Sequence, residues 1–118
     1  MKEINGEIQH NGETYKLVFN LNVMEIIQDK YGSIDKWAEL TDGTGKEPNI
    51  EAVIFGITEM INEGIDIDNE NATAPEQVRR FLTKKRVGRI LTDIGVQEVT
   101  QVMNDTVVAS TKGEEKNE

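Results

Sequence analysis

Cysteine is absent from this 118-residue sequence, which excludes disulfide bonds and thiolate zinc sites. Long apolar runs are absent as well, because none approaches the roughly 20 residues that a membrane-spanning helix needs. The first residues, MKEINGEIQ, lack the apolar core of a secretory signal peptide. Together these absences favour a protein of the reducing cytoplasm with no membrane segment.

Residues with catalytic or metal-binding chemistry are also scarce. His10 is the only histidine, so no second imidazole can share a metal with it. We expect it to be an exposed residue beside a turn. Serine and carboxylate side chains are plentiful, but no pattern pairs a nucleophile with a base. The sequence therefore predicts a protein without enzymatic activity, cofactor or bound metal.

Two short stretches match binding motifs only in part. Residues 43–46, GTGK, resemble a phosphate-binding loop, but the first glycine of that motif is missing, and Glu47 stands where serine or threonine is needed. The acidic residues of 66–70 alternate as at the start of a calcium loop. Asn71 and Gln77, however, occupy the positions that require glycine and a bidentate glutamate. We expect a surface turn and an exposed acidic loop at these two places.

Charge is distributed unevenly along the chain. With 13 basic and 22 acidic residues, the formal net charge is −9. Six of the basic residues lie in one stretch that contains no acid: Arg79, Arg80, Lys84, Lys85, Arg86 and Arg89. The other 7 basic residues stand against all 22 acidic ones, which leaves −15 outside this basic segment.

The N-terminal residues predict a β-hairpin. Asn11 and Gly12 form the dipeptide preferred in a two-residue type I′ turn, whose central positions both need positive φ. With these two residues as the loop, Ile8 lies opposite Tyr15 and the apolar residues share one face. That face consists of Ile4, Ile8, Tyr15, Leu17 and Phe19. Because a lone hairpin is marginal in water, we expect helices to cover it.

The next residues predict a first helix. Asn22 is a good N-cap, and Glu25 completes a variant capping box. Leu21 and Ile26 have the spacing of a hydrophobic staple, and Gly32 ends the helix. Its predicted buried stripe is Val23, Ile26, Ile27 and Tyr31.

Cap residues mark further helices along the chain. Ser33 precedes a short helix. Asn49 precedes a long and largely apolar helix from Ile50 to Glu63, which Gly64 closes. Gly56 within this central helix indicates close packing against a neighbour, because glycine costs about 1 kcal/mol relative to alanine there.

The C-terminal third predicts a turn and two more helices. Pro75 starts a short turn that extends through Leu82. Thr83 caps a helix that Gly95 closes, and the residues from Val96 to Ala109 form the last helix.

These elements predict an α+β fold, mostly α, in which the N-terminal hairpin packs on a bundle of about four to five helices. Residues 1–111 form a single domain, and residues 112–118 a disordered charged tail.

The basic segment allows three interpretations. Lys84, Lys85 and Arg86 fall in the first turn of a predicted helix, where the macrodipole is already positive and each misplaced charge costs about 0.3–1 kcal/mol. The segment is a solvated face, an interface with an acidic protein surface, or a DNA contact. LTKKRVGRILTDIGV has the spacing of a helix-turn-helix. Against DNA stand the −15 elsewhere and the lack of base-reading side chains beyond Gln97 and Gln101.

Three stretches of the chain read, in order, YKLVFNLNVMEIIQDKYGS, AVIFGITEMINEGIDID and LTKKRVGRILTDIG. Together with the tail rich in lysine and glutamate, they resemble the tail assembly chaperones of long-tailed bacteriophages and prophages. The similarity covers about residues 4–111. Its motifs are packing patterns, so it transfers no catalytic residue.

The resemblance implies a non-enzymatic protein of the infected or lysogenic cell. Such chaperones coat the helical tape measure protein, keep it soluble, help to recruit tail tube protein, and are left out of the mature virion. Many self-associate, and many are also made in a longer form by ribosomal frameshifting. We expect the six residues of the basic segment to bind a protein partner, with nucleic acid and membrane disfavoured. A small helix-turn-helix-like DNA-binding regulator that uses the basic segment is the alternative function.

Overall fold

A computed structural model describes residues 6–42 and 47–116, and of residues 112–116 only the backbone. The described residues form one hairpin, five α-helices and a 3-10 turn. In chain order they are β1 (Glu7–His10), β2 (Glu13–Lys16), α1 (Leu21–Tyr31), α2 (Ile34–Thr41), α3 (Ile50–Glu70), the 3-10 turn η1 (Pro75–Gln77), α4 (Lys84–Ile94) and α5 (Val96–Lys116). The predicted class, α+β and mostly α, is confirmed.

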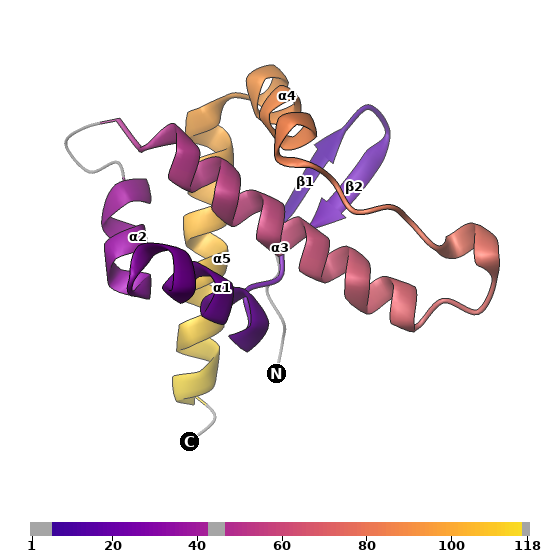
Figure 1. Ribbon diagram of the computed structural model, residues 1–118, viewed down its shortest axis with the longest axis horizontal. Helices are drawn as coiled ribbons and strands as arrows, with labels where there is room; N and C mark the ends of the chain where they lie inside the picture. Colours follow the sequence, from indigo (N-terminus) through magenta and orange to yellow (C-terminus); the bar gives the residue numbers. More distant parts are fainter. Residues whose placement is uncertain (1–5, 43–46, 117–118) are drawn as a thin grey trace.

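Helix α3 runs through the middle of the molecule, and β2, α1, α2, α4 and α5 all contact it (Figure 1). Asn49 caps this helix as predicted, because its side-chain oxygen accepts a hydrogen bond from the Ala52 amide at 2.9 Å. Most of the first four turns are buried, including Ala52, Val53, Ile57 and Met60, each with 0% exposure. The apolar residues of all the other elements pack into this one core.

The hairpin has the predicted register and turn. Asn11 and Gly12 have φ values of 52° and 83°, as a type I′ turn requires. Ile8 pairs with Tyr15, and both side chains are buried. The Leu17 amide continues the pairing with a 2.9 Å hydrogen bond to the Gly6 carbonyl. Ile4 lies outside the described residues.

The predicted end of α3 at Gly64 is wrong, since the helix continues to Glu70. Gly64 is buried in mid-helix, where the end of β2 crosses it. A Cβ on Gly64 would lie 3.0 Å from the Lys16 carbonyl oxygen, and the Val18 amide donates to the Met60 carbonyl at 3.2 Å. The glycine therefore serves a close backbone approach, and the expected loop over residues 66–74 begins as helix.

The predicted start of α1 is also wrong. Asn20 is the N-cap, with its Oδ1 accepting from the Val23 amide at 3.2 Å. Asn20 and Asn22 both donate through Nδ2 to Glu63 of α3, at 2.8 and 3.1 Å, so a distant carboxylate fixes the orientation of both side chains. The staple is absent, because Leu21 is 76% exposed and Ile26, expected in the buried stripe, is 40% exposed.

The other helix ends agree with the sequence more closely. Ser33 and Thr83 accept the expected capping hydrogen bonds, and Gly32 and Gly95 have positive φ at the ends of α1 and α4. Helix α5 is longer than expected, because its backbone stays helical to Lys116. Most of the tail predicted to be disordered is thus helical in backbone, and residues 117 and 118 lie outside the described residues.

Candidate partner-binding surface

An extended segment, residues 78–83, joins the 3-10 turn to α4 and is called the strap here. Figure 1 shows it beside the C-terminal half of α3. Asn69 accepts a hydrogen bond from the Arg79 amide and donates one to the Arg79 carbonyl, both at 3.0 Å. Asn62 makes the same pair of bonds with Leu82, at 2.8 and 3.0 Å. Each asparagine thus binds both the backbone N–H and the backbone C=O of one residue of the strap.

The spacing of these two asparagine clamps follows from helix and strand geometry. Asn62 and Asn69 are two turns apart on α3, about 10.5 Å along the helix axis. Arg79 and Leu82 are three residues apart in extended chain, which spans about 10 Å. Because the two lengths match, both clamps close without distortion. The strap's position is set by its backbone, so the side chains between the clamps are available for other contacts.

Two apolar side chains of the strap face solvent. Val78 is 53% exposed and Phe81 is 57% exposed. Isolated exposed apolar residues are normal on protein surfaces, but an aromatic side chain on a backbone fixed at both ends is a suitable anchor for a partner. The sequence predicted Phe81 as part of a turn, and the structure shows an extended chain there instead.

The six residues of the basic segment divide into two groups. Arg79 is engaged within the molecule, because its Nη2 lies 2.8 Å from Glu13 Oε1 and its guanidinium lies 5.2 Å from the Tyr15 ring centre. Lys84 is engaged as well, with its Nζ 5.0 Å from the ring centre of Phe55. These two cations hold the strap and α4 to the rest of the fold.

The other four cations are exposed: Arg80, Lys85, Arg86 and Arg89. None has an ion-pair partner among the described side chains, which are those of residues 6–42 and 47–111. Because the strap leads directly into α4, Arg80, Lys85 and Arg86 follow Val78 and Phe81 closely along the chain (Figure 1). We call these six residues, Val78, Arg80, Phe81, Lys85, Arg86 and Arg89, the basic–apolar surface.

The position of Lys84 at the positive end of α4 has a structural explanation. Its charge lies over the electron-rich face of Phe55 and near the carboxylates of Glu51 and Glu59. Burial raises the pKa of Glu59, and the nearby Lys84 opposes that rise. A partly buried carboxylate and a cation at a helix N-terminus thus stabilise each other.

A second polar cluster joins α1 to the start of α3. The Tyr31 hydroxyl donates to Glu51 Oε1 at 2.7 Å, and Lys30 Nζ lies 3.0 Å from Glu51 Oε2. These hydrogen bonds lower the pKa of Glu51, whereas burial and the adjacent carboxylate raise the pKa of the Tyr31 hydroxyl. The arrangement is an inter-helix brace, with no nucleophile or base directed at an enclosed space.

His10 is not the exposed residue that the sequence predicts. Its Nε2 lies 2.8 Å from Asp93 Oδ2, and its side chain is only 14% exposed. The contact ties the hairpin turn to α4. Local sequence could not show this, because the two residues are 83 positions apart.

The structure describes only one of the two partial motifs. Residues 43–46 lie outside the described residues. Asp66, Asp68 and Glu70 are helical, and Asp68 pairs with Lys16 at 3.2 Å. In the part of the chain that the structure describes, no group of three histidine, aspartate or glutamate side chains could hold a metal ion.

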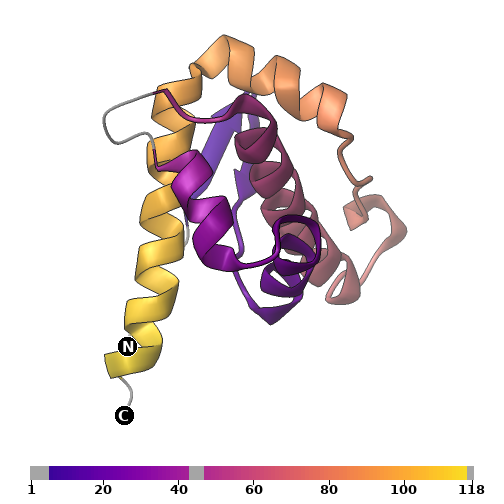
Figure 2. The same cartoon turned by 60° about the vertical axis from the view of Figure 1, so that its left-hand side comes forward.

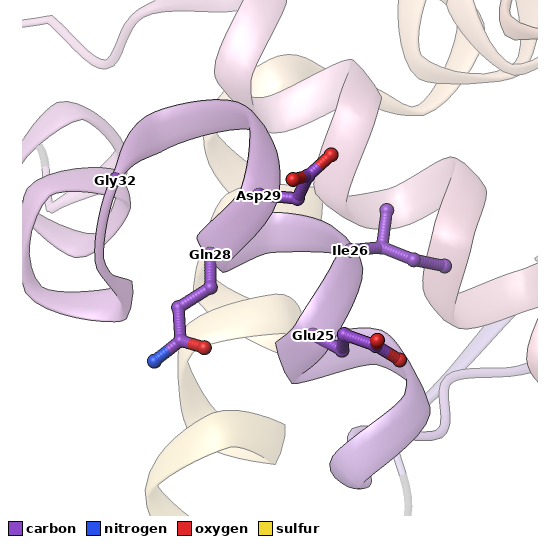
Figure 3. A pocket seen from close by; sticks show the side chains of 5 residues that line it. All are labelled: Glu25, Ile26, Gln28, Asp29 and Gly32. Atoms are coloured by element: carbon purple, nitrogen blue, oxygen red, sulfur yellow. The ribbon is translucent and has the colours of Figure 1, made fainter.

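Two open concavities on the surface are lined by residues that the structure describes. One, of about 630 Å³, lies over the outer face of α1 and is lined by Glu25, Ile26, Gln28, Asp29 and Gly32. Figure 3 shows that these side chains do not converge on a common point. The other, of about 430 Å³, is a groove between α2 and α5. Neither resembles the enclosed pocket in which catalysis takes place.

The exposed face of α5 is poorly suited to DNA. Gln97 and Gln101 are exposed as the helix-turn-helix interpretation requires, but Glu98 and Asp105 are exposed on the same helix. Gln101 also donates to Asp105 at 2.9 Å. Carboxylates beside the only base-reading side chains repel phosphate. The local charge therefore disfavours a DNA contact along this face of α5.

None of the described helices is long and apolar enough to cross a membrane. Comparison of the chain with protein-family models, with curated proteins and with solved structures finds no match.

Proposed function

We propose that this protein is a non-enzymatic tail assembly chaperone of a long-tailed bacteriophage or prophage. It binds the tape measure protein in the cytoplasm of the host cell, assists assembly of the tail tube, associates with further copies of itself, and is left out of the mature virion. The three sequence stretches quoted above resemble this family, and that resemblance is the reason to propose it. The geometry adds a surface suited to protein contacts.

The observation that carries the proposal is the basic–apolar surface. Phe81 is exposed between the two asparagine clamps, and Val78 is exposed one residue before the first clamped residue. The exposed cations Arg80, Lys85 and Arg86 follow along the chain, with no ion-pair partner among the side chains that the structure describes. An aromatic anchor with arginine around it is the composition of energetically important protein interfaces. The acidic remainder of the molecule supplies the charge that keeps a complex with an apolar helix in solution.

Two matched pairs of variants test the proposal. Phe81→Ser removes the anchor, and Leu21→Ser removes an even more exposed apolar side chain from α1. Arg80→Glu reverses a cation of the surface, and Lys36→Glu reverses an exposed cation of α2. Each protein is co-expressed with the tape measure protein encoded beside it, and the complex is isolated by size-exclusion chromatography.

We expect Phe81→Ser and Arg80→Glu each to weaken the complex about tenfold or more, because interface anchors and complementary charges dominate binding. Leu21→Ser and Lys36→Glu should bind as the unmodified protein does. Absence of any complex, or equal binding by all four variants, would contradict the proposal.

The DNA-binding alternative is tested by a gel shift at two salt concentrations. A genuine DNA complex forms at low salt and weakens steeply as salt rises, because bound cations are released from the phosphates. We expect no complex at either concentration.

A further inference from the structure

We propose that the groove between α2 and α5 binds a short amphipathic helix of a partner protein, and that this helix carries lysine or arginine. The inference rests on the proposed function only for the identity of the protein that supplies this helix. Figure 2 shows α2 beside α5, and Asn104 Nδ2 donates to the Thr41 carbonyl at 3.3 Å where the two helices meet.

The floor of the groove is apolar. Its apolar lining residues are Val107 and Val108 of α5 and Trp37 and Ala38 of α2. Val108 is 51% exposed, whereas Trp37 is 1% exposed, so the floor is partly covered by its own fold and partly open. An open apolar floor leaves area for a further side chain to bury.

The rim of the groove is acidic. Asp35 and Glu39 of α2, and Asp42 directly after it, line the groove at spacings that place them on the same face as Ala38. No basic residue is among the lining residues that the structure describes. Asp35 and Glu39 are both exposed. A ligand that covers the apolar floor must therefore bring positive charge to this rim.

The shape of the groove selects a helix. Both walls are helices whose backbone groups are bonded internally, so the groove offers no free strand edge to an extended peptide. Helix α2 has 8 residues and a length of about 12 Å, which matches about two turns of a bound helix. Side chains spaced three and four residues apart would reach the floor, and flanking lysine or arginine would reach Asp35 and Glu39.

A second copy of this chain is a poor occupant. The one described helix that begins with several cations is α4, and its apolar residues Val87, Ile90 and Leu91 are already buried in its own core. It has no apolar stripe left to place in the groove of another molecule. The occupant is therefore a helix of a different protein.

The test uses a synthetic peptide and the fluorescence of Trp37, the single tryptophan of the chain. The peptide has 18 residues, is rich in alanine, presents leucine on one face with lysine beside it, and contains no aromatic residue. A second peptide carries glutamate in place of every lysine. We expect a saturable change in Trp37 fluorescence with the lysine peptide and none with the glutamate peptide.

Variants separate the groove from general charge attraction. Asp35→Lys with Glu39→Lys should weaken peptide binding about tenfold or more. Glu25→Lys with Asp29→Lys makes the same change of charge on α1, outside the groove, and should alter binding by no more than about twofold. Val108→Ser should weaken binding, whereas Leu21→Ser should not. Helical circular dichroism confirms that each variant is folded.

Three results would overturn the inference: no binding of the lysine peptide, equal binding of both peptides, or equal weakening by the two double variants. Concentration-dependent dimerisation that Asp35→Lys with Glu39→Lys abolishes would assign the groove to a second copy and also overturn it. The peptide result is independent of the co-expression result, so failure of the groove and failure of the chaperone function are distinguishable.

Discussion

At Gly56, helix α3 lacks a side chain so that Trp37 of α2 can lie against its backbone. A Cβ at this position would overlap a carbon of the Trp37 ring. That ring is fixed, because Trp37 is buried and its Nε1 donates to the Ala52 carbonyl at 3.0 Å. The sequence predicted close packing at this glycine but could not name the partner.

We expect Gly56→Ala to lower the free energy of unfolding by about 1–3 kcal/mol, because overpacking outweighs the better helix propensity of alanine. Gly88→Ala is the matched control, since Gly88 is also inside a helix and the side chain nearest to the new Cβ, at Ile54 Cδ1, would lie 3.7 Å away. That variant should be more stable by up to about 1 kcal/mol. Urea denaturation measures both, and changes of the same sign would contradict this account.

Cap residues were the most predictable feature at this scale. Ser33, Asn49 and Thr83 each accept the hydrogen bond that the sequence predicts, because capping depends on residues within one turn. The exception is Asn20, where Glu63 of another helix orients the competing asparagines. A contact across 43 positions leaves no local signal.

At the scale of elements, the strap depends on the two asparagines of α3. Replacing Asn62 and Asn69 with alanine removes four hydrogen bonds to the backbone of Arg79 and Leu82. The strap should then open locally. We expect amide hydrogen exchange at these two residues to rise about tenfold or more, while exchange in the core of α3 changes little.

Asn71→Ala is the control for the clamp experiment. Asn71 is exposed, lies two residues beyond Asn69, and its side chain makes no hydrogen bond within the described residues. Its replacement should leave the strap amides as they are. If Asn71→Ala raises hydrogen exchange in the strap to the same degree, the cause is local weakening of the end of α3. Loss of the two asparagine clamps is then not the cause.

Element boundaries were predicted less well than element identities. Gly64 is a normal helix terminator in sequence, but its role here depends on β2, which packs across α3. The basic segment was visible as a run of charge. Its division into internal and exposed cations depends on Glu13, Tyr15 and Phe55, which only the folded chain brings close.

At the scale of the whole molecule, acidic residues outnumber basic ones by 22 to 13, so loss of one negative charge relieves general repulsion. Whether this relief of repulsion raises the free energy of unfolding depends on the local surroundings of the carboxylate that is removed. Glu51 and Glu59 are two turns apart on α3, and their pKa values shift in opposite directions. Replacing each with glutamine makes the same change in net charge.

We expect Glu59→Gln to raise the free energy of unfolding at neutral pH. Burial raises the folded-state pKa of Glu59 above its ordinary value of 4.5, so its charged form costs stability at high pH. That cost is fully present above the raised pKa and disappears as pH falls below 4.5. Thermal unfolding at pH 7 and pH 3.5 should show a gain only at the higher pH.

Glu51→Gln should have the opposite sign. Hydrogen bonds from Tyr31 and Lys30 lower the folded-state pKa of Glu51, so its charged form stabilises the fold above 4.5, and that contribution is lost as pH falls through the lowered pKa. The loss should be small, because the Glu51 side chain is 57% exposed. Equal gains from both variants would show that net charge alone decides stability.

The groove between α2 and α5 was invisible in the sequence. Its walls are some 60 positions apart, and each reads as part of an ordinary amphipathic helix. The class of fold, the hairpin register and most of the core followed from local periodicity. Surfaces assembled from distant elements did not, because no periodicity records which faces become neighbours.

The asparagine clamps have a consequence for how this protein can diverge. Each clamp binds the backbone N–H and C=O of one residue and makes no hydrogen bond to its side chain, so the clamp itself requires only that the residue is not proline, which has no amide hydrogen. Positions 80 and 81, between the two clamped residues, can therefore exchange while the chain path is kept. Related proteins can acquire new partners there without rebuilding their interior, and a foreign recognition sequence can be grafted between the two anchor points.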